Sequence, residues 1–235
     1  ATTPWIELSG EEAHHAARVA RLRPGDAVSV FDGAGLEAAG QIETVGRHAV
    51  AVRLLKTMRH APPKVSVTLA VGGLHRERMQ EEVVRHAAEL GVHRVCFWSA
   101  EHSQRPVTLN ARWRKTAIEA CKQCGRFYLP LVDIAPSLDA FLENNAGPCI
   151  IGLLEKSQPD DAPVLTVTDR LTLLVGPEGD FSAGELARAF AAGAAPLSLG
   201  AYTYRSEVAA TIMATLVAFK LEELGPGLEL RLTRQ

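Results

Sequence analysis

Short apolar segments separated by turn signals dominate the first quarter of the chain. Residues 27–33 and 48–56 have the β-branched, partly alternating composition of strands. The glycine-rich stretch 33–40 lacks both the GxGxxG spacing and the following helix of a phosphate-binding loop, so a hairpin loop is expected there. Residues 11–26 predict a short helix followed by a Pro-Gly turn. Together these patterns predict a small β-rich unit over residues 1–62.

A linker with two neighbouring prolines, residues 57–64, precedes a region with a different pattern. Short apolar strands alternate there with segments of helical spacing. The expected strands are 65–71, 93–99, 131–135, 149–154, 171–175 and 196–200, and the expected helices are 77–90, 111–124, 138–144, one that begins after Ser182, and 206–223. This alternation indicates a mostly parallel sheet covered on both faces. The sequence therefore predicts an α/β domain over residues 63–235.

The composition is that of an ordinary soluble globular protein. Of the 235 residues, 47% are hydrophobic and 22% are charged, which allows a sizeable core without disulfides. The formal net charge of -2 argues against bulk attraction to nucleic acid, although a local patch can still carry binding. Neither a signal peptide nor a membrane span is expected, because the longest apolar run, around 208–219, is shorter than the ~20 residues of a membrane helix.

The cysteines indicate a reducing compartment. Only Cys121 and Cys124 are close in sequence, and no second pair or HxxxH element completes the ligands of a zinc site. The pair lies late in an expected helix, whereas a redox pair is expected at the start of a helix that follows a strand. We therefore expect two reduced helix cysteines, no metal site and a cytoplasmic protein.

Unusual residues follow three of the expected strands, where open α/β sheets bind their ligands. Residues 153–156 end one strand with a charged pair. Residues 176–181 form a loop with two glycines and a proline, and the helix after it has the capping-box spacing Ser182 to Glu185. Residues 197–210 again end a strand in a glycine before a long helix. Glycines let backbone groups approach a ligand closely, although an ordinary tight turn has the same composition.

Arg205 and Glu207 lie where this last helix is expected to begin. A cation at a helix N-terminus opposes the helix dipole, so Arg205 is not placed there to stabilise the helix. Two interpretations are open: a salt bridge between the two side chains, or a fixed cation at the mouth of a ligand site.

Two groups of cations are candidate RNA-binding surfaces. Arg18, Arg21 and Arg23 lie on the expected N-terminal helix and its turn, either as a solvated face or as an edge that contacts phosphate. Residues 105–126 contain one acid, Glu119, and six cations, which are Arg105, Arg112, Arg114, Lys115, Lys122 and Arg126. This local excess suggests phosphate contact, although a solvated helix face has the same composition.

These motifs together resemble a known family. LLVGPEGDFSAGEL and LSLGAYTYRSEVAA are similar to the paired signature of the SPOUT methyltransferases, whose C-terminal chain forms a trefoil knot. More narrowly, nearly the whole chain resembles the bacterial 16S ribosomal RNA uridine-N3 methyltransferase family. HHAARVARLRPGDAVSVFDGAG is similar to that family's N-terminal PUA-like barrel, and RHAAELGVHRVCFWSAEHS and RWRKTAIEACKQCGR are similar to its middle segments.

Some positions depart from the family pattern. Asp180 stands where the family usually has a glycine, and Tyr202 stands where it has an arginine. Ser206 and Val208 replace two threonines. The positions that match the family are Arg78, Met79, Arg205, Glu207 and Ala209. The departures concern target choice and rate more than cofactor binding.

The resemblance implies a fold, a cofactor and partners. The fold is an α/β SPOUT domain with a trefoil-knotted, mostly parallel sheet, preceded by a PUA-like, RNA-binding β-barrel over 1–62. The cofactor is S-adenosyl-L-methionine, and its expected contacts are Leu154, Val175, Gly176, Glu178, Gly179, Leu199, Gly200 and Tyr204. The partner is the 16S rRNA of the small ribosomal subunit, and its expected contacts are Arg18, Arg21, Arg23, Arg78, Arg105, Arg112 and Arg126. A homodimer is also implied, in which the apolar helix 206–223 packs on a partner or, alternatively, on its own core.

The implied reaction methylates uracil N3, an imide nitrogen that must lose its proton. Arg205 is expected to be catalytic, because a fixed guanidinium stabilises the negative charge that spreads onto O2 and O4. Glu207 is the second catalytic candidate, as the base or, preferably, as a group that orients Arg205 or caps the helix. Two other functions are open: a SPOUT enzyme with another target such as a tRNA ribose, and a non-catalytic RNA-binding relic of the fold.

Overall fold

The chain divides into two compact units, Ala1–Pro62 and Pro63–Gln235. The structure, a computed structural model, describes residues 4–103, 105–145, 147–154 and 166–221. Glu155 and Lys156, the charged end of one expected strand, lie outside the described residues, as does the end of the expected helix 206–223.

The N-terminal unit consists of a small antiparallel sheet and a helical segment. Its elements are β1 (Trp5–Ser9), α1 (Gly10–His14), a π-helical turn (His15–Val19), β2 (Ala27–Phe31), β3 (Leu36–Val45) and β4 (Ala49–Arg59). The strands pair in the order β1-β4-β3-β2. Ile42, Val50 and Val52 of the sheet pack against Ala13 and Ala16 of the helical segment. These contacts form a core that belongs to this unit alone.

The prediction of a hairpin loop over residues 33–40 is wrong in its second half. β3 begins at Leu36 and pairs with both β2 and β4. The glycines of residues 33–40 led to the prediction of a loop, because glycine is typical of turns. A Cβ on Gly40 would lie 2.9 Å from the carbonyl oxygen of Arg53, and the register of β3 against β4 shifts at this residue. Gly40 therefore marks an irregularity inside a strand, where the two backbones approach closely, and not a loop.

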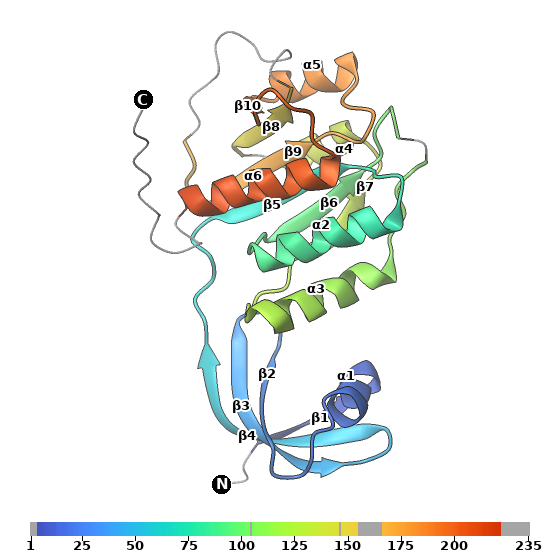
Figure 1. Ribbon diagram of the computed structural model, residues 1–235. Helices are drawn as coiled ribbons and strands as arrows, with labels where there is room; N and C mark the ends of the chain where they lie inside the picture. The colour runs from blue at the N-terminus through green and yellow to red at the C-terminus, as the bar shows by residue number, and fades with distance from the viewer. Residues whose placement is uncertain (1–3, 104, 146, 155–165, 222–235) are drawn as a thin grey trace, which may run out of the picture. The chain divides into compact units, whose positions relative to one another are not determined.

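The C-terminal unit contains a six-stranded parallel sheet (Figure 1). Its strands are β5 (Ser66–Gly72), β6 (Arg94–Trp98), β7 (Leu131–Ala135), β8 (Cys149–Leu153), β9 (Arg170–Val175) and β10 (Ala195–Ser198). Its helices are α2 (Glu77–Glu89), α3 (Ala111–Cys124), α4 (Leu138–Glu143), α5 (Ala183–Ala191) and α6 (Ser206–Lys220). All pairings between neighbouring strands are parallel. The predicted alternation of strands and helices is confirmed.

Helices cover both faces of this sheet. α4 and α5 bury Phe141 and Ala189 in a core with Trp98, Ile151 and Leu174 of the strands. α2 and α6 contact each other, α6 contacts β5 and β9, and α3 packs beside α2 (Figure 1). The central strands are buried on both sides, which explains why their sequences are nearly continuous apolar runs.

The strand order places a topological switch at the centre of the sheet. The order is β10-β8-β9-β5-β6-β7, so the chain runs outward from β5 through β6 to β7 and returns on the other side at β8. β5 and β9 are neighbours, although they are far apart in the sequence. Ligands of open α/β sheets bind at such a point, beyond the carboxyl ends of the strands.

Candidate functional site

The loop of residues 176–182, between β9 and α5, is held tightly against the sheet. The Asp180 N–H donates to the Pro177 carbonyl at 3.0 Å, which closes a turn. A Cβ on Gly72, at the end of β5, would lie 2.6 Å from the Pro177 nitrogen. The buried Phe181 ring stacks on Trp98 with a centroid distance of 5.7 Å. Glycine is therefore needed at position 72, because the backbone at the end of β5 touches this loop.

Asp180, the residue that replaces a usual glycine, has a glycine-like backbone. Its φ is 62°, in the left-handed region that non-glycine residues rarely adopt. Its Oδ1 accepts a hydrogen bond from the Phe181 N–H at 2.8 Å. Aspartate tolerates this conformation better than most residues because its short side chain can bond the neighbouring backbone. The substitution thus preserves the shape of the loop.

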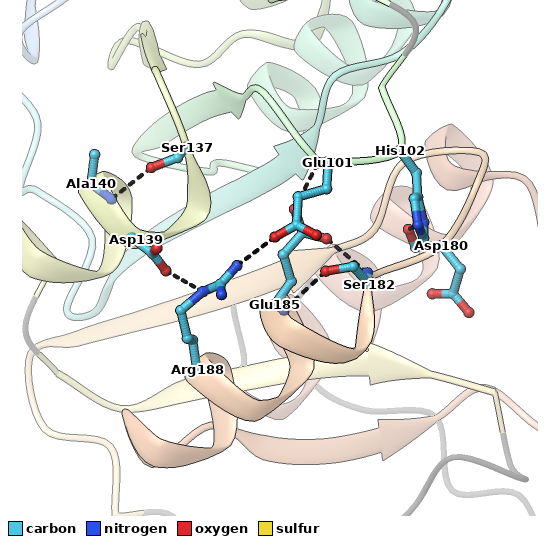
Figure 2. A network of polar contacts seen from close by, with 9 residues as sticks. All are labelled: Glu101, His102, Ser137, Asp139, Ala140, Asp180, Ser182, Glu185 and Arg188. Carbon is cyan, nitrogen blue, oxygen red and sulfur yellow. Dashed lines mark hydrogen bonds and ion pairs between the residues drawn. The ribbon is translucent and has the colours of Figure 1, made fainter.

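Glu185 joins this loop to the loop that follows β6 (Figure 2). Its carboxylate accepts from the Ser182 N–H at 2.8 Å and from the Glu101 N–H at 2.9 Å, and only 1% of the residue is exposed. The Ser182 hydroxyl in turn accepts from the Glu185 N–H at 3.1 Å, so the predicted capping box is confirmed. One buried carboxylate therefore fixes two loops and one helix end.

His102 makes a second link between the same loops. Its Nδ1 lies 3.1 Å from the carbonyl oxygen of Gly179 and 3.2 Å from that of Asp180. Both neighbours are acceptors, so Nδ1 carries the proton. The carboxylate of Glu101, the residue before His102, accepts a hydrogen bond from the Arg188 guanidinium at 2.8 Å, and Arg188 also pairs with Asp139 of α4 (Figure 2).

Replacing Glu185 with alanine is expected to lower the free energy of unfolding of the C-terminal unit by about 2–4 kcal/mol, because the buried Ser182 N–H and the partly buried Glu101 N–H both lose their acceptor. Unfolding in urea can be followed by the fluorescence of the buried Trp98 and Trp113 in a Trp5→Phe background. The control Glu119→Ala removes a partly exposed ion pair with Lys122. It should change the free energy of unfolding by less than about 1 kcal/mol. Equal effects would contradict the role of Glu185 as a clamp.

A cavity of about 340 Å³ opens beyond the ends of β8, β9 and β10, and we call it the strand-end cavity. Its lining residues are Gly152, Leu153, Leu154, Val175, Gly176, Pro177, Glu178, Asp180, Leu199, Tyr202, Thr203, Tyr204, Arg205, Ser206 and Ala209. α6 packs closely beside it, since a Cβ on Gly152 would lie 2.5 Å from the Met213 sulfur. All three expected strand-end segments thus contribute to one cavity.

Arg205 lies at the N-cap position of α6 and its side chain is exposed. Within the part of the chain that the structure describes, its guanidinium forms no ion pair, so the interpretation as a salt bridge with Glu207 is wrong. Glu207 lies in the first turn of α6, is only 8% exposed, and its Oε2 has no hydrogen-bond partner among the described residues. Arg205 is therefore available to a ligand, whereas Glu207 lines neither cavity of the site.

Most of the expected cofactor contacts come together. Six of the eight line the strand-end cavity with Arg205: Leu154, Val175, Gly176, Glu178, Leu199 and Tyr204. Gly179 lines a neighbouring cavity, and Gly200, with a φ of 99°, shapes the turn before α6 without lining either one. Among the residues that the sequence did not single out is Gly152, whose position inside an apolar strand signals a close approach.

A second, larger cavity of about 850 Å³ lies beside the first, and we call it the wide cavity. Its walls are the loops after β5, β6 and β9 and the first turns of α2 and α3. Its polar and charged lining residues include His75, Glu77, Gln80, His102, Arg105, Asn110, Arg112 and Glu178. Glu178 is the residue that both cavities share. The sequence did not predict this cavity, because no spacing in the chain indicates that the loops after β5 and β6 meet Glu178.

The expected RNA contacts occupy different surroundings. Arg105 and Arg112 line the wide cavity, and Arg78 is exposed beside Glu82. Arg126 donates to the Glu89 carbonyl at 2.8 Å and packs on Gly91, which gives it a structural role at the end of α2. In the N-terminal unit, the side chains of Arg18, Arg21 and Arg23 are exposed.

The cysteines are not reactive groups of this site. All four are free, and burial raises the pKa of the Cys96 and Cys149 thiols to about 12 and that of Cys121 to about 11. Across the described residues, no three His, Cys, Asp or Glu side chains gather closely enough to hold a metal ion. No helix in the described ranges is long and apolar enough to cross a membrane.

Sheet topology, tight glycine loops and a cavity at the switch point are typical of α/β domains that bind nucleotide-like ligands. The chain belongs to the RNA methyltransferase domain family, which residues 61–218 match. Residues 8–55 match the RNA methyltransferase PUA domain. The family resemblance seen in the sequence is therefore confirmed.

Relatives and solved structures agree with this membership. The ribosomal RNA small subunit methyltransferase E of Mycobacterium bovis is 29% identical over 217 residues, which cover 87% of this chain and 82% of the relative. A probable rRNA-methyltransferase from Porphyromonas gingivalis has a TM-score of 0.82 and 28% identity, covering 93% of this chain and 94% of its own. A presumed methyltransferase from Legionella pneumophila, solved with the bound cofactor SAM, has a TM-score of 0.79 and 27% identity. The match covers 96% of this chain and 94% of the Legionella chain.

Proposed function

We propose that this protein transfers a methyl group from S-adenosyl-L-methionine to N3 of a uridine in the 16S rRNA of the small ribosomal subunit. The observation that carries the proposal is the strand-end cavity, in which three loops meet and an exposed Arg205 stands at the edge. Relatives named as small subunit rRNA methyltransferases and a SAM-bound neighbour support the choice of substrate and cofactor. The trefoil knot and the cytoplasmic location remain predictions.

The cavity fits the proposed cofactor in size and chemistry. Its volume of about 340 Å³ falls within the ~300–1,000 Å³ of small-molecule sites. Leu153, Leu154 and Leu199 offer apolar surface to an adenine ring, and the backbone at Gly176 offers polar groups. A Cβ on Gly176 would lie only 3.1 Å from the Phe181 ring, so glycine keeps this loop close to the sheet. When bound, the cofactor supplies a methyl group activated by a sulfonium.

Arg205 provides charge stabilisation in the proposed reaction. Loss of the N3 proton spreads negative charge onto O2 and O4 of the uracil, and a guanidinium held at a helix start can pair with that charge. Arg205 is free to do so because the described residues leave it without an ion pair. Orientation of the imide toward the methyl group supplies further acceleration. Glu207 is buried beside this region, and we assign it to the support of α6, not to contact with the substrate.

RNA binding is proposed for both units. In the C-terminal unit, Arg105, Arg112 and Arg78 would contact phosphates, and Arg126 would support the same surface. In the N-terminal unit, residues 1–62, the exposed Arg18, Arg21 and Arg23 would contact folded RNA. The target base would be extruded from its stack to reach the cavity.

A homodimer is proposed through α6. Val208, Leu216 and Phe219 are exposed on this helix at 41%, 44% and 46%. Leu216 lies 8 residues after Val208, and Phe219 lies 3 residues after Leu216. This spacing places all three side chains along one side of the helix. Such an apolar stripe on a surface is typical of an interface. Core packing among the described residues leaves these three side chains exposed.

The decisive experiment uses purified small subunits that lack the modification. We expect protein and cofactor labelled in the methyl group to place label on 16S rRNA, and nucleoside analysis to give N3-methyluridine. Label on a tRNA ribose in a parallel reaction would instead favour the alternative target. Absence of cofactor binding in a titration would favour an RNA-binding relic.

A further inference from the structure

Glu178 occupies a special place between the two cavities. It is the one described residue that lines both the strand-end cavity, proposed for the cofactor, and the wide cavity, which is lined by Arg105 and Arg112. A methyl group that leaves the first cavity for a base that arrives through the second passes this residue. The side chain of Glu178 therefore stands where the two substrates would meet.

The carboxylate of Glu178 is fixed without being neutralised. Its Oε1 accepts a hydrogen bond from the His75 N–H at 2.9 Å, which ties the side chain to the loop after β5. Within the described chain, no cation pairs with it and its Oε2 makes no hydrogen bond. The residue is exposed to the cavities. One oxygen thus holds the group in place, and the other is open to a proton donor.

Other candidate bases near the cavities are less suitable. Asp180 lines only the strand-end cavity, whereas Glu178 lines both cavities. His102 lines only the wide cavity and directs its Nδ1 to two carbonyl groups. Glu207 lines neither cavity. Tyr202 and Tyr204 line only the strand-end cavity and not the wide cavity.

We infer that the acceptor uracil enters through the wide cavity and that Glu178 accepts its imide proton. This inference rests on the proposed function. As N3 bonds to the methyl carbon, the carbon–sulfur bond breaks and its electron pair stays on sulfur, which becomes a neutral thioether. The N3–H bond breaks in the same step, its electron pair stays on nitrogen, and the proton passes to the free Glu178 oxygen. Arg205, in the lining of the strand-end cavity, balances the negative charge that develops on the uracil before transfer is complete.

The test compares Glu178→Gln with the unmodified protein in single-turnover methylation of small subunits. Glutamine keeps an oxygen that can accept from the His75 N–H, but it cannot take up a proton. The single-turnover rate is expected to fall by about 100-fold or more, the usual contribution of a general base, with the dissociation constant of S-adenosylmethionine within about twofold. Glu143→Gln removes the same charge from an exposed residue at the end of α4 that lines neither cavity, and it should leave the rate within about threefold.

A more acidic acceptor distinguishes proton transfer from other roles. In subunits that carry 5-fluorouridine at the target, the fluorine makes N3–H more acidic and reduces the need for a base. The rate gap between the two proteins should narrow by at least about tenfold. The inference is overturned if Glu178→Gln methylates at the normal rate, or if lost cofactor affinity accounts for the whole fall in rate. It is also overturned if His102→Gln lowers the rate and Glu178→Gln does not, or if fluorination leaves the rate ratio between the two proteins unchanged. Unmodified protein that does not methylate uracil N3 would overturn both this inference and the proposed function.

Discussion

Replacing Arg205 with alanine is expected to reduce methyl transfer by about 100- to 1,000-fold while S-adenosylmethionine binds within about threefold of its normal affinity. The guanidinium is exposed at the rim of the strand-end cavity, and no group of the described chain neutralises it. It therefore has little to do in the resting protein. Its contribution arises when the uracil becomes anionic, so its loss should appear in the chemical step and not in cofactor binding.

Two variants make the Arg205 result specific. Arg205→Lys keeps the charge but not the planar pair of donors, and we expect it to recover only part of the lost rate. Arg78→Ala removes another exposed arginine, one that pairs with Glu82 on α2 and lines neither cavity, and should weaken RNA binding without a large change in the rate of the bound complex. Single-turnover rates and calorimetric titration of the cofactor separate these effects. A full rate in Arg205→Ala would remove this residue from the mechanism.

The sequence predicted the sheet well because its signal is local. Each central strand is a short apolar run bounded by turn residues, and burial on both faces preserves that pattern. The helix after residue 182 was predictable for the same reason, since a serine and a glutamate three positions later describe its cap completely. The missed strand β3 lacks this signal, because alanine and glycine are poor indicators of a strand even where the backbone pairs on both sides.

The site was only partly predictable because much of it is formed by distant segments. The strand-end cavity could be predicted from the rule that ligands bind beyond the carboxyl ends of strands, and two of its three segments, residues 176–181 and 197–210, carry glycines. The wide cavity brings Gly73–His75, His102 and residues 105–112 to Glu178. No spacing in the chain indicates that contact. The buried state of Glu207 was equally hidden, because it depends on how α6 is rotated against its neighbours and not on the charge of the residue.

The close approach of β5 to the loop of residues 176–182 leads to a second prediction of large effect. A Cβ on Gly72 would lie 2.6 Å from both Cδ and N of Pro177, a distance that real Cβ atoms do not reach. The loop is held on its other side by the Phe181 ring and by Glu185, so it cannot move away without breaking those contacts. Gly72→Ala must therefore displace either the end of β5 or the loop.

We expect Gly72→Ala to weaken S-adenosylmethionine binding by about 10- to 100-fold, equivalent to the ~1–3 kcal/mol typical of overpacking. The matched control is Gly184→Ala in α5, where the nearest atom to the new Cβ is Arg188 Nη1 at 3.0 Å, the end of a flexible side chain. That variant should bind the cofactor within about twofold of the normal affinity and gain about 0.4–1 kcal/mol of stability, because alanine restricts the unfolded chain more than glycine does. Calorimetric titration of both variants measures the difference. Normal affinity in Gly72→Ala would mean that the backbone of this loop does not hold the cofactor, and Arg205 would then stand beside a cavity that binds something else.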